Sequence, residues 1–333
     1  MLTGHYPRTK LAFTPTPIEK LDRLSEFLGG PEIYIKRDDQ TGLAFGGNKV
    51  RQLEYYFGEA EKQNADVILI TGAVQSNYMR TAVAAARKLG MDVEVQLEER
   101  VPDQPQEYYK SGNPYLMKLM GAKFHHYPVG EDEEGADNAL YERAEILKSH
   151  GKKPYVIPLA GHHLPLGSLG YVDCAAEIND QMPDADYIVT GSGSATTHSG
   201  VLAGLRAIGN NTPVIGICVR RDRHAQQERV HKKTEIVMDM INVDKSVPLS
   251  DVQLFDDTLA PGYGRLNDYV KEAIKLAAEK EGLLVDPVYT GKALAGLIKL
   301  IRDGKFSKSD KILFIHTGGT PALFGYPALT ESD

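Results

Sequence analysis

The feature that most constrains the fold of this chain is a regular alternation of short apolar runs with longer amphipathic stretches. Strands are expected where the runs are apolar and bounded by turn residues, at 33–36, 67–71, 92–96, 123–126, 155–157, 187–190, 214–219 and 311–316. Helices are expected at 18–28, 49–62, 77–89, 115–120, 138–150, 166–181, 197–208, 228–240, 267–281 and 290–303. This alternation is typical of parallel sheets covered by helices, so we predict an α/β fold with open, mostly parallel twisted sheets.

Composition narrows the class of protein. The chain is 42% hydrophobic and 25% charged, as in soluble globular proteins, and its net charge of −7 argues against a nucleic-acid surface. The basic run 220–223 contains an acid and is interpreted as a solvated face. No apolar run is long enough to span a membrane, and none follows Arg8 and Lys10, so no secretory signal is expected. Cys174 and Cys218 have no metal-binding spacing and indicate buried thiols in a cytoplasmic protein.

Lys49 is the first candidate for chemistry. It follows Gly46-Gly47-Asn48 and opens an amphipathic stretch. A lysine at the buried end of such a helix loses hydration, which lowers its pKa and makes it reactive toward an aldehyde. The alternative is an ordinary solvated lysine.

The segment 191–197 follows a predicted strand and contains two glycines and four hydroxyl residues. Backbone N–H groups and hydroxyls in such a loop suit a phosphate. A dinucleotide-binding turn is disfavoured, because Thr196 occupies the third glycine position and no acid follows about 20 residues later. A glycine turn without a ligand stays an alternative.

Further polar residues stand at the ends of predicted strands or in loops. Ser76 and Asn77 begin a predicted helix, where they act as a cap or hold an anion. Thr317 precedes a Gly-Gly turn, and Tyr263 and Tyr289 lie in loop-like sequence where a hydroxyl either faces a cleft or packs.

Together these segments resemble the D-cysteine desulfhydrase and 1-aminocyclopropane-1-carboxylate deaminase group of fold type II pyridoxal-phosphate enzymes. The likeness runs from about Pro7 to Tyr326 and is carried by the following segments: Thr16-Pro17, 35–39, 46–49, 75–77, 261–264, 286–292 and 316–319.

The resemblance implies a role for each matching residue. Lys49 would bind pyridoxal 5'-phosphate as an imine, and Asn77 would contact the ring hydroxyl. Thr317 or Thr290 would face the ring nitrogen, as a neutral group that makes the ring a mild electron sink. The phosphate would be held by Gly193, Ser194, Ala195, Thr196 and Thr197.

The substrate side follows from the same resemblance. Lys49 would remove the α-proton, Ser76 and Asn77 would hold the carboxylate, and Tyr289 and Tyr263 would act near the β-carbon. Other residues expected to line the substrate side are Gln75, Tyr78, His162 and His163. The resemblance implies no metal.

The expected reaction is α,β-elimination of a β-substituted amino acid to pyruvate and ammonia. Thr290 and Ala293 match the desulfhydrases, which favours D-cysteine and disfavours the cyclopropane deaminases. His162 and His163 depart from the family pattern and, if partly cationic, favour an anionic side chain, so L-cysteate, losing sulfite, is the rival substrate. The alternative is that the two histidines lie in a loop and face solvent. Tyr78 and Thr196 also depart from it and leave a non-catalytic binding protein as a further alternative.

For domain organisation we predict a small domain, 49–158, and a large one formed by 1–48 with 159–333. The cofactor would lie between them. A homodimer is implied by the resemblance, and the only other expected partner is a small amino-acid substrate.

Overall fold

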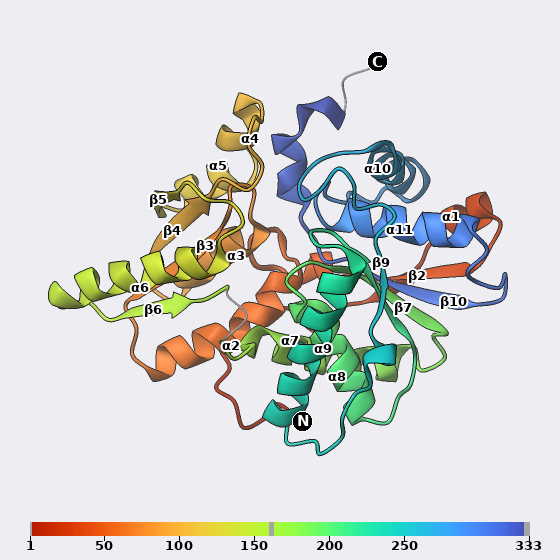
Figure 1. The fold of residues 1–333 in the computed structure, drawn as a ribbon, viewed down its shortest axis with the longest axis horizontal. Coiled ribbons are helices and arrows are strands. Elements are labelled where there is room, and N and C mark those ends of the chain that lie inside the picture. The colour runs from red at the N-terminus through yellow and green to blue at the C-terminus, as the bar shows by residue number, and fades with distance from the viewer. Residues whose placement is uncertain (1, 160–162, 330–333) are drawn as a thin grey trace.

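The computed structural model describes residues 2–159 and 163–329, which form two sheets, each flanked by helices (Figure 1). The larger sheet has the strand order β1-β2-β10-β7-β8-β9, and the smaller has the order β5-β4-β3-β6. Only the pairing of β1 with β2 is antiparallel among the described strands. The predicted α/β class with mostly parallel sheets is therefore confirmed.

The strands of the larger sheet come from both ends of the chain and are β1 (Ile18–Lys20), β2 (Glu32–Lys36), β7 (Tyr187–Ser192), β8 (Val214–Cys218), β9 (Gln253–Phe255) and β10 (Lys311–Ile315). Those of the smaller sheet are consecutive and are β3 (Val67–Ala73), β4 (Asp92–Glu98), β5 (Lys123–Tyr127) and β6 (Pro154–Ile157). The two sheets thus separate along the sequence much as the predicted domains do, and that division stays a prediction.

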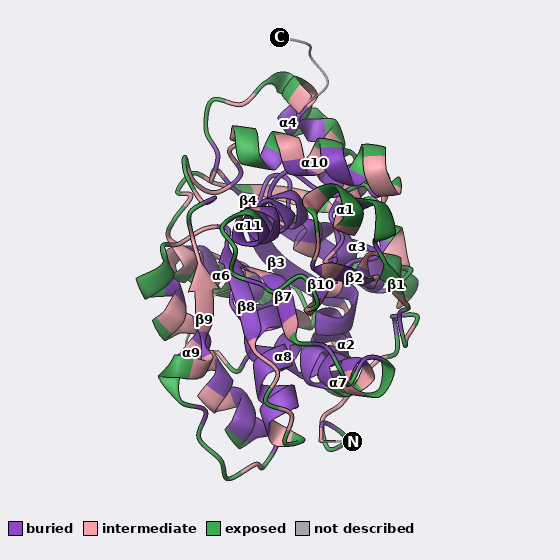
Figure 2. Cartoon of the chain, turned by 90° about the vertical axis from the view of Figure 1, so that its right-hand side faces the viewer, coloured by how far each residue is buried: buried purple, intermediate pink, exposed green. Residues whose placement is uncertain are grey.

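The larger sheet is buried on both faces because side chains alternate along each strand. On β10, Leu313 and Ile315 pack against one group of helices, and Ile312 and Phe314 pack against the other. The first group is α7 (Leu166–Gln181), α8 (Thr196–Ala207) and α9 (Arg223–Met240). The second is α1 (Asp22–Leu28), α10 (Asp268–Glu281) and α11 (Thr290–Arg302). Figure 2 shows the buried strands between these two helical layers.

The smaller sheet follows the same rule. Ile68 and Ile70 of β3 face α2 (Asn48–Lys62), α3 (Asn77–Lys88) and α5 (Asn113–Leu119). Val67 and Leu69 face α6 (Glu133–Ser149). The remaining short elements are α4 (Gln106–Lys110) and 3₁₀ turns at Asp38–Gln40, Leu43–Phe45, Leu249–Asp251, Thr320–Gly325 and Pro327–Leu329.

A buried ion-pair network fixes the start of α2, which carries Lys49. The Asp38 carboxylate accepts hydrogen bonds from Arg51 Nε at 2.9 Å and from the Tyr171 hydroxyl at 2.6 Å. Arg51 also donates to Glu177 on α7. Burial alone would raise the pKa of Asp38, but the Arg51 guanidinium holds it below its usual value, so the pair stays charged. Breaking such a pair leaves an uncompensated buried charge, which keeps the first turns of α2 in place.

The prediction from the sequence is wrong for some short elements. The segment expected to be one helix at 18–28 begins as strand β1, antiparallel to β2, and becomes helical only at Asp22. Strand β9 and helix α4 were not predicted, because three and five residues are too few to show a period.

Cys174 and Cys218 are buried free thiols, as predicted. No helix in the described part of the chain combines the length and apolarity needed to cross a membrane.

Candidate active site

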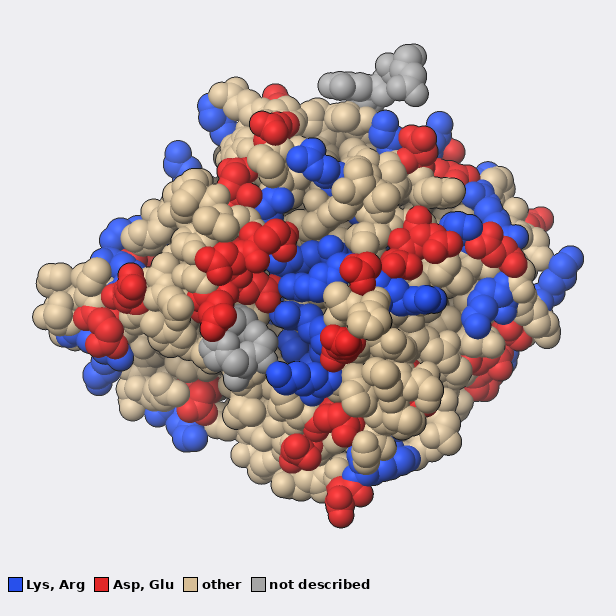
Figure 3. All heavy atoms as spheres, viewed as in Figure 1, with Lys and Arg blue, Asp and Glu red and all other residues tan. Residues whose placement is uncertain are grey.

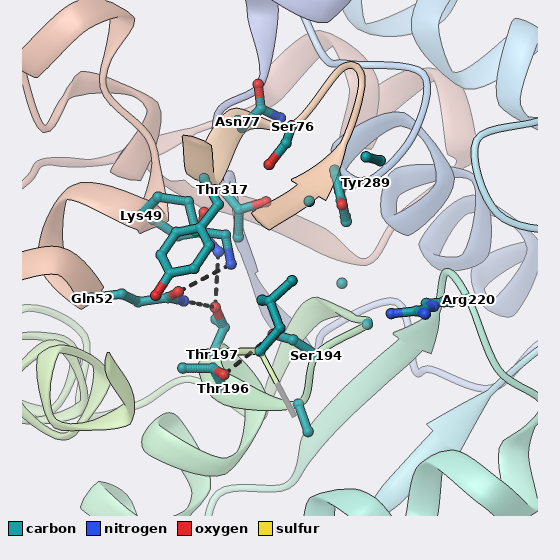
Figure 4. Close-up of a pocket in the computed structure, with 18 of the residues that line it drawn as sticks. Lys49, Gln52, Ser76, Asn77, Ser194, Thr196, Thr197, Arg220, Tyr289 and Thr317 are labelled. Carbon is teal, nitrogen blue, oxygen red and sulfur yellow. Dashed lines mark hydrogen bonds between the residues drawn. The ribbon is translucent and has the colours of Figure 1, made fainter. Parts of the chain in front are cut away.

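A cavity lies between the two sheets and is lined by residues from both (Figure 4). Its walls include Thr71, Gly72 and Ala73 at the carboxyl end of β3, and the loop that follows β7. In open parallel sheets, ligands bind at the carboxyl ends of the strands. The position of the cavity therefore follows from the topology.

Twelve of the residues predicted from the sequence line this one cavity. They come from six separate segments and are Lys49, Ser76, Asn77, Tyr78, Gly193, Ser194, Ala195, Thr196, Thr197, Tyr263, Tyr289 and Thr317.

Lys49 lies in the first turn of α2, and its Nζ donates to Oε1 of Gln52 at 3.0 Å. The ammonium also lies over the Tyr78 ring, 5.1 Å from its centroid. Desolvation by the cavity walls lowers the pKa of Lys49 to about 8. A larger fraction of this amine is therefore uncharged near neutral pH than in an ordinary lysine, and only the uncharged amine attacks a carbonyl.

The amide of Asn77 has a fixed orientation. Its Oδ1 accepts from Arg80 Nη1 at 2.8 Å and from Asn113 Nδ2 at 3.0 Å. Both hydrogen bonds occupy the oxygen, so the NH₂ group is the part of the amide left to serve the cavity. Asn77 is therefore set up as a donor, suited to a phenolate or carboxylate oxygen.

Ser76 combines the two interpretations that the sequence allowed. It is the N-cap of α3, and its Oγ accepts from the backbone N–H of Met79 at 3.2 Å. It also lines the cavity, and its own O–H is not needed for the cap. Ser76 can thus donate to an anion placed at the positive end of α3.

The loop after β7 ends at the N-terminus of α8. Ala195 has a φ of 70°, and the first bond of the helix runs from the Ser199 N–H to the Ala195 carbonyl at 2.8 Å. The preceding N–H groups of Thr196 and Thr197 have no carbonyl one turn earlier in the helix. These donors and the Ser194 hydroxyl lie at the cavity wall, which is the arrangement that binds phosphate.

Lys233 supplies a positive charge behind this loop, and sequence reasoning missed it. From α9, its Nζ donates to the Ser194 carbonyl at 3.0 Å and lies 3.4 Å from Thr196 Oγ1. Burial lowers the pKa of Lys233 to about 7, and the neighbouring Arg229 acts in the same direction. A dianion at the loop would restore the charged form. The only available signal was its spacing of four residues from Arg229, on one face of α9.

Tyr263 and Tyr289 meet through a hydrogen bond between their hydroxyls. Burial raises the pKa of both phenols, so both are neutral at physiological pH. The buried Asp286 carboxylate positions Tyr289 by accepting from its backbone N–H at 3.0 Å. The pair can therefore pass a proton or hydrogen bond from one hydroxyl to the other at the cavity wall.

Three predicted site residues have other surroundings. The Gln75 amide donates to the Tyr108 and Ser111 carbonyls and does not line the cavity. The Thr290 hydroxyl donates to Asp286 at 2.7 Å, and Thr290 lies outside the cavity wall. Of the two threonines that the resemblance offered for the ring nitrogen, Thr317 is therefore the one that lines the cavity. His163 lies 3.7 Å from Asp137 and lines neighbouring hollows. His162 lies outside the described residues.

The interpretation of the run 220–223 as a solvated face is wrong for its first residue. Arg220 follows β8, its side chain is only 6% exposed, and it lines the cavity. Arg100, which follows β4, lines it too, as does Glu133. Figure 3 shows Lys and Arg side chains gathered in a hollow at the middle of this face. No sequence pattern marks these residues as neighbours, because the topology brings three distant segments together.

The residues that line the cavity are chemically suited to bind pyridoxal phosphate. A partly desolvated amine, an amide held as a donor and an anion-binding helix terminus line a single cavity. Within residues 2–159 and 163–329, no group of side chains is arranged to hold a metal ion.

Comparison with known proteins gives the family. The family model "Pyridoxal-phosphate dependent enzyme" matches residues 9–318, so this chain belongs to that family. D-cysteine desulfhydrase of Serratia proteamaculans is 41% identical over 97% of both chains. The protein of the same name from Salmonella paratyphi C is 42% identical over 96% of both chains.

Solved structures agree with this fold. The crystal structure of an ACC deaminase homologue is 37% identical, covers 98% of this chain and 96% of its own, and has a TM-score of 0.86. A hydrogen sulfide-producing enzyme from Fusobacterium nucleatum, with 17% identity and a TM-score of 0.65, shares the fold. The expected family and cofactor are thereby confirmed.

Proposed function

We propose that this protein is a D-cysteine desulfhydrase, which eliminates sulfide from D-cysteine and leaves pyruvate and ammonia. The observation that carries the proposal is the desolvated amine of Lys49 in the same cavity as the phosphate-type loop. The names of the relatives at 41–42% identity support the choice of substrate.

Pyridoxal phosphate would be held by Lys49, by the Gly193–Thr197 loop and by the Asn77 amide, and it supplies the electron sink that acidifies the Cα–H bond. Thr317 lines the cavity and would face the ring nitrogen, as the resemblance implies; a neutral hydroxyl there would not enforce a full positive charge on that nitrogen, as a carboxylate would. A mild sink suits a substrate whose β-substituent leaves promptly.

Different side chains of the protein would then bind the substrate and move its protons. Ser76 and the N-terminus of α3 hold the substrate carboxylate and orient the Cα–H bond. The amine of Lys49, once released by the substrate amine, accepts the α-proton, and a pKa of about 8 is well matched to this task. The tyrosine pair orients the β-substituent and supplies a proton to the departing sulfur.

The stoichiometry is one cysteine and one water to one pyruvate, one ammonia and one hydrogen sulfide. The test is a screen of D-cysteine, L-cysteine, D- and L-serine and 3-chloro-D-alanine with the yellow holoenzyme, measuring pyruvate and sulfide together. Sulfide equal to pyruvate from D-cysteine supports the proposal. The proposal is contradicted if the enzyme turns over L-serine instead of D-cysteine, or if it turns over none of these substrates.

The proposal includes a homodimer, as the resemblance implies, in the cytoplasm. Sedimentation equilibrium of the full-length holoenzyme measures the oligomeric state directly, and a monomer at micromolar concentration would contradict this part.

A further inference from the structure

Gln52 is a buried polar residue that contacts the amine of Lys49 in the cavity. It lies three residues after Lys49 on α2, so the two side chains project from the same face of the helix. Only 2% of Gln52 is exposed, and α7 packs closely behind it because Gly167 lacks a side chain: a Cβ there would lie 3.0 Å from the Cβ of Gln52. A buried amide needs partners for both its oxygen and its NH₂ group, so its hydrogen bonds indicate its function.

The direction of the Gln52 amide is set by the loop after β7. Its Nε2 donates to Oγ1 of Thr197 at 3.0 Å, and Asn48 Nδ2 donates to the same oxygen at 2.9 Å. These two bonds occupy both lone pairs of the hydroxyl, so its O–H is left to donate toward the cavity that Thr197 lines. Because Nε2 is committed to Thr197, Oε1 of Gln52 faces Lys49 and accepts from Nζ at 3.0 Å. Figure 4 shows the hydrogen bonds from Lys49 through Gln52 to Thr197.

The Gln52 carbonyl gives the Lys49 amine a defined direction. Among the described residues, no other oxygen accepts a hydrogen bond from this amine. The Tyr78 ring, with its centroid 5.1 Å from Nζ, attracts a cation through its face but fixes no single N–H bond. An uncharged amine has two N–H bonds and one lone pair, so an N–H given to Gln52 turns the lone pair away from Gln52 and toward the rest of the cavity.

We infer that Gln52 is a positioning residue for Lys49, which holds the amine once it is released from the cofactor and directs its lone pair at the α-proton of the substrate. The inference rests on the proposed elimination and adds to it the group that orients the base. In this step the Cα–H bond breaks, its proton moves to the lone pair of the amine, and its electron pair stays on the substrate side, where the cofactor withdraws it. The ammonium so formed keeps its hydrogen bond to Gln52, and a charged donor makes that bond stronger.

A purely structural function is the competing explanation, in which Gln52 only braces the loop through Thr197. The two ends of the amide separate these explanations, because Oε1 contacts the amine and Nε2 contacts the loop. Gln52→Glu keeps an oxygen at the amine and replaces the N–H at the loop by a second oxygen. Gln52→Met keeps the length of the side chain and removes both polar ends.

The first experiment uses the apoenzyme and pyridoxal, which has the aldehyde but no phosphate, and measures how the rate of borohydride-trapped attachment at residue 49 depends on pH. The wild-type midpoint should lie near the pKa of Lys49, which burial lowers to about 8. Gln52→Glu places a carboxylate against the amine and favours the ammonium, so it should raise the midpoint by about one pH unit or more. Gln52→Met removes the acceptor and should not raise it.

The two variants together decide whether Gln52 acts on Lys49. A higher midpoint in Gln52→Glu alone supports the inference, and a higher midpoint in both variants, or in neither, overturns it. If Gln52→Met does not fold, Gln52→Glu decides by itself. The titratable groups that share the cavity with Lys49, among them Tyr78, Glu133 and Lys233, are the same in both variants and cannot cause the difference.

Gln63→Met is the matched control for the glutamine substitution. Gln63 ends the same helix, but its amide donates to Glu59 at the exposed surface, so the midpoint should stay at the wild-type value.

The second experiment tests the α-proton itself in the holoenzyme. Single turnovers are followed with the amino acid that gives pyruvate fastest, carrying either hydrogen or deuterium at Cα. The isotope-sensitive step should be about tenfold slower in Gln52→Met, because its base is no longer oriented, while substrate affinity changes less than about threefold. An isotope-sensitive step at the wild-type rate overturns the inference. The pyridoxal experiment needs no amino acid, so failure of the D-cysteine assignment leaves its result unchanged and the two failures are distinguishable.

Discussion

The two ends of the cavity are assembled in different ways. At the phosphate end, most donors come from one continuous segment, 193–197, and the cation Lys233 is added from a distant helix. At the tyrosine end, every group comes from a different segment: Arg100, Arg220, Tyr263 and Tyr289. The comparison shows that a binding site formed by one continuous loop can be recognised in the sequence, whereas a site formed by long side chains from separate segments cannot.

The largest effect is expected from Lys49→Ala, which removes the amine proposed to attach the cofactor. Without the amine there is neither covalent attachment nor a base for the α-proton, so we expect turnover to fall by about 10³-fold or more. Borohydride reduction followed by peptide mapping measures the attachment directly. The wild-type protein should carry the reduced adduct on residue 49.

Lys233 sharpens this test, because it is a second buried amine in the same cavity with a lowered pKa. An adduct on Lys233 in the wild-type protein would contradict the assignment of Lys49. Lys292 is a useful internal reference, since it is buried too but donates to the Leu259 and Gly262 carbonyls outside the cavity. It should remain unmodified throughout.

The tyrosine end is tested by Tyr289→Phe and Tyr263→Phe. Each removes one hydroxyl of the hydrogen-bonded pair, and we expect each to lower kcat by about 10²-fold, the usual range for a positioned proton donor. Because the hydroxyls act through one another, the double variant should lose little more than either single variant. Fully multiplicative losses would show two independent functions. Unchanged near-ultraviolet circular dichroism provides the control for folding.

The two ends of the cavity also differ in how much of each could be predicted from the sequence. The strands β3, β7 and β10, Lys49 and the loop 193–197 were predicted because period, glycine turns and hydroxyl clusters are local signals. Gln52, three residues after Lys49 on the same helix, had a usable signal that was overlooked. Arg100, Glu133 and Arg220 had none, since their function depends on which strand ends the two sheets bring together.

Local sequence also misled in specific ways. Gln75 and Thr290 stand beside true cavity residues, but their side chains turn to backbone carbonyls and to Asp286. A motif fixes the path of the backbone, and neighbouring tertiary contacts then decide which side chains face the ligand.

The phosphate end is tested by Lys233→Met, with Lys232→Met as the matched control on the exposed side of the same helix. We expect Lys233→Met to weaken binding of pyridoxal phosphate about tenfold, a loss of about 1.4 kcal/mol, because one charge-assisted contact near the phosphate is removed. Binding of pyridoxal, which lacks the phosphate, should hardly change. Absorbance titration of the apoenzyme gives both dissociation constants. Equal weakening for both ligands would show that Lys233 only supports the loop.

The smallest expected effect is the pH dependence of covalent attachment at Lys49, measured with a ligand that does not use the phosphate end. With pyridoxal as ligand, the rate of covalent attachment should follow the uncharged fraction of Lys49, whose pKa burial lowers to about 8. The rate should rise about fivefold from pH 7 to 8 and less than twofold from pH 8 to 9, because the amine is then mostly neutral. A free lysine derivative measured alongside should keep rising about tenfold per pH unit over the same range, since its pKa is near 10.4. A protein rate that also rises tenfold between pH 8 and 9 would show that the cavity does not desolvate Lys49, and the tyrosine end would then have to supply the base.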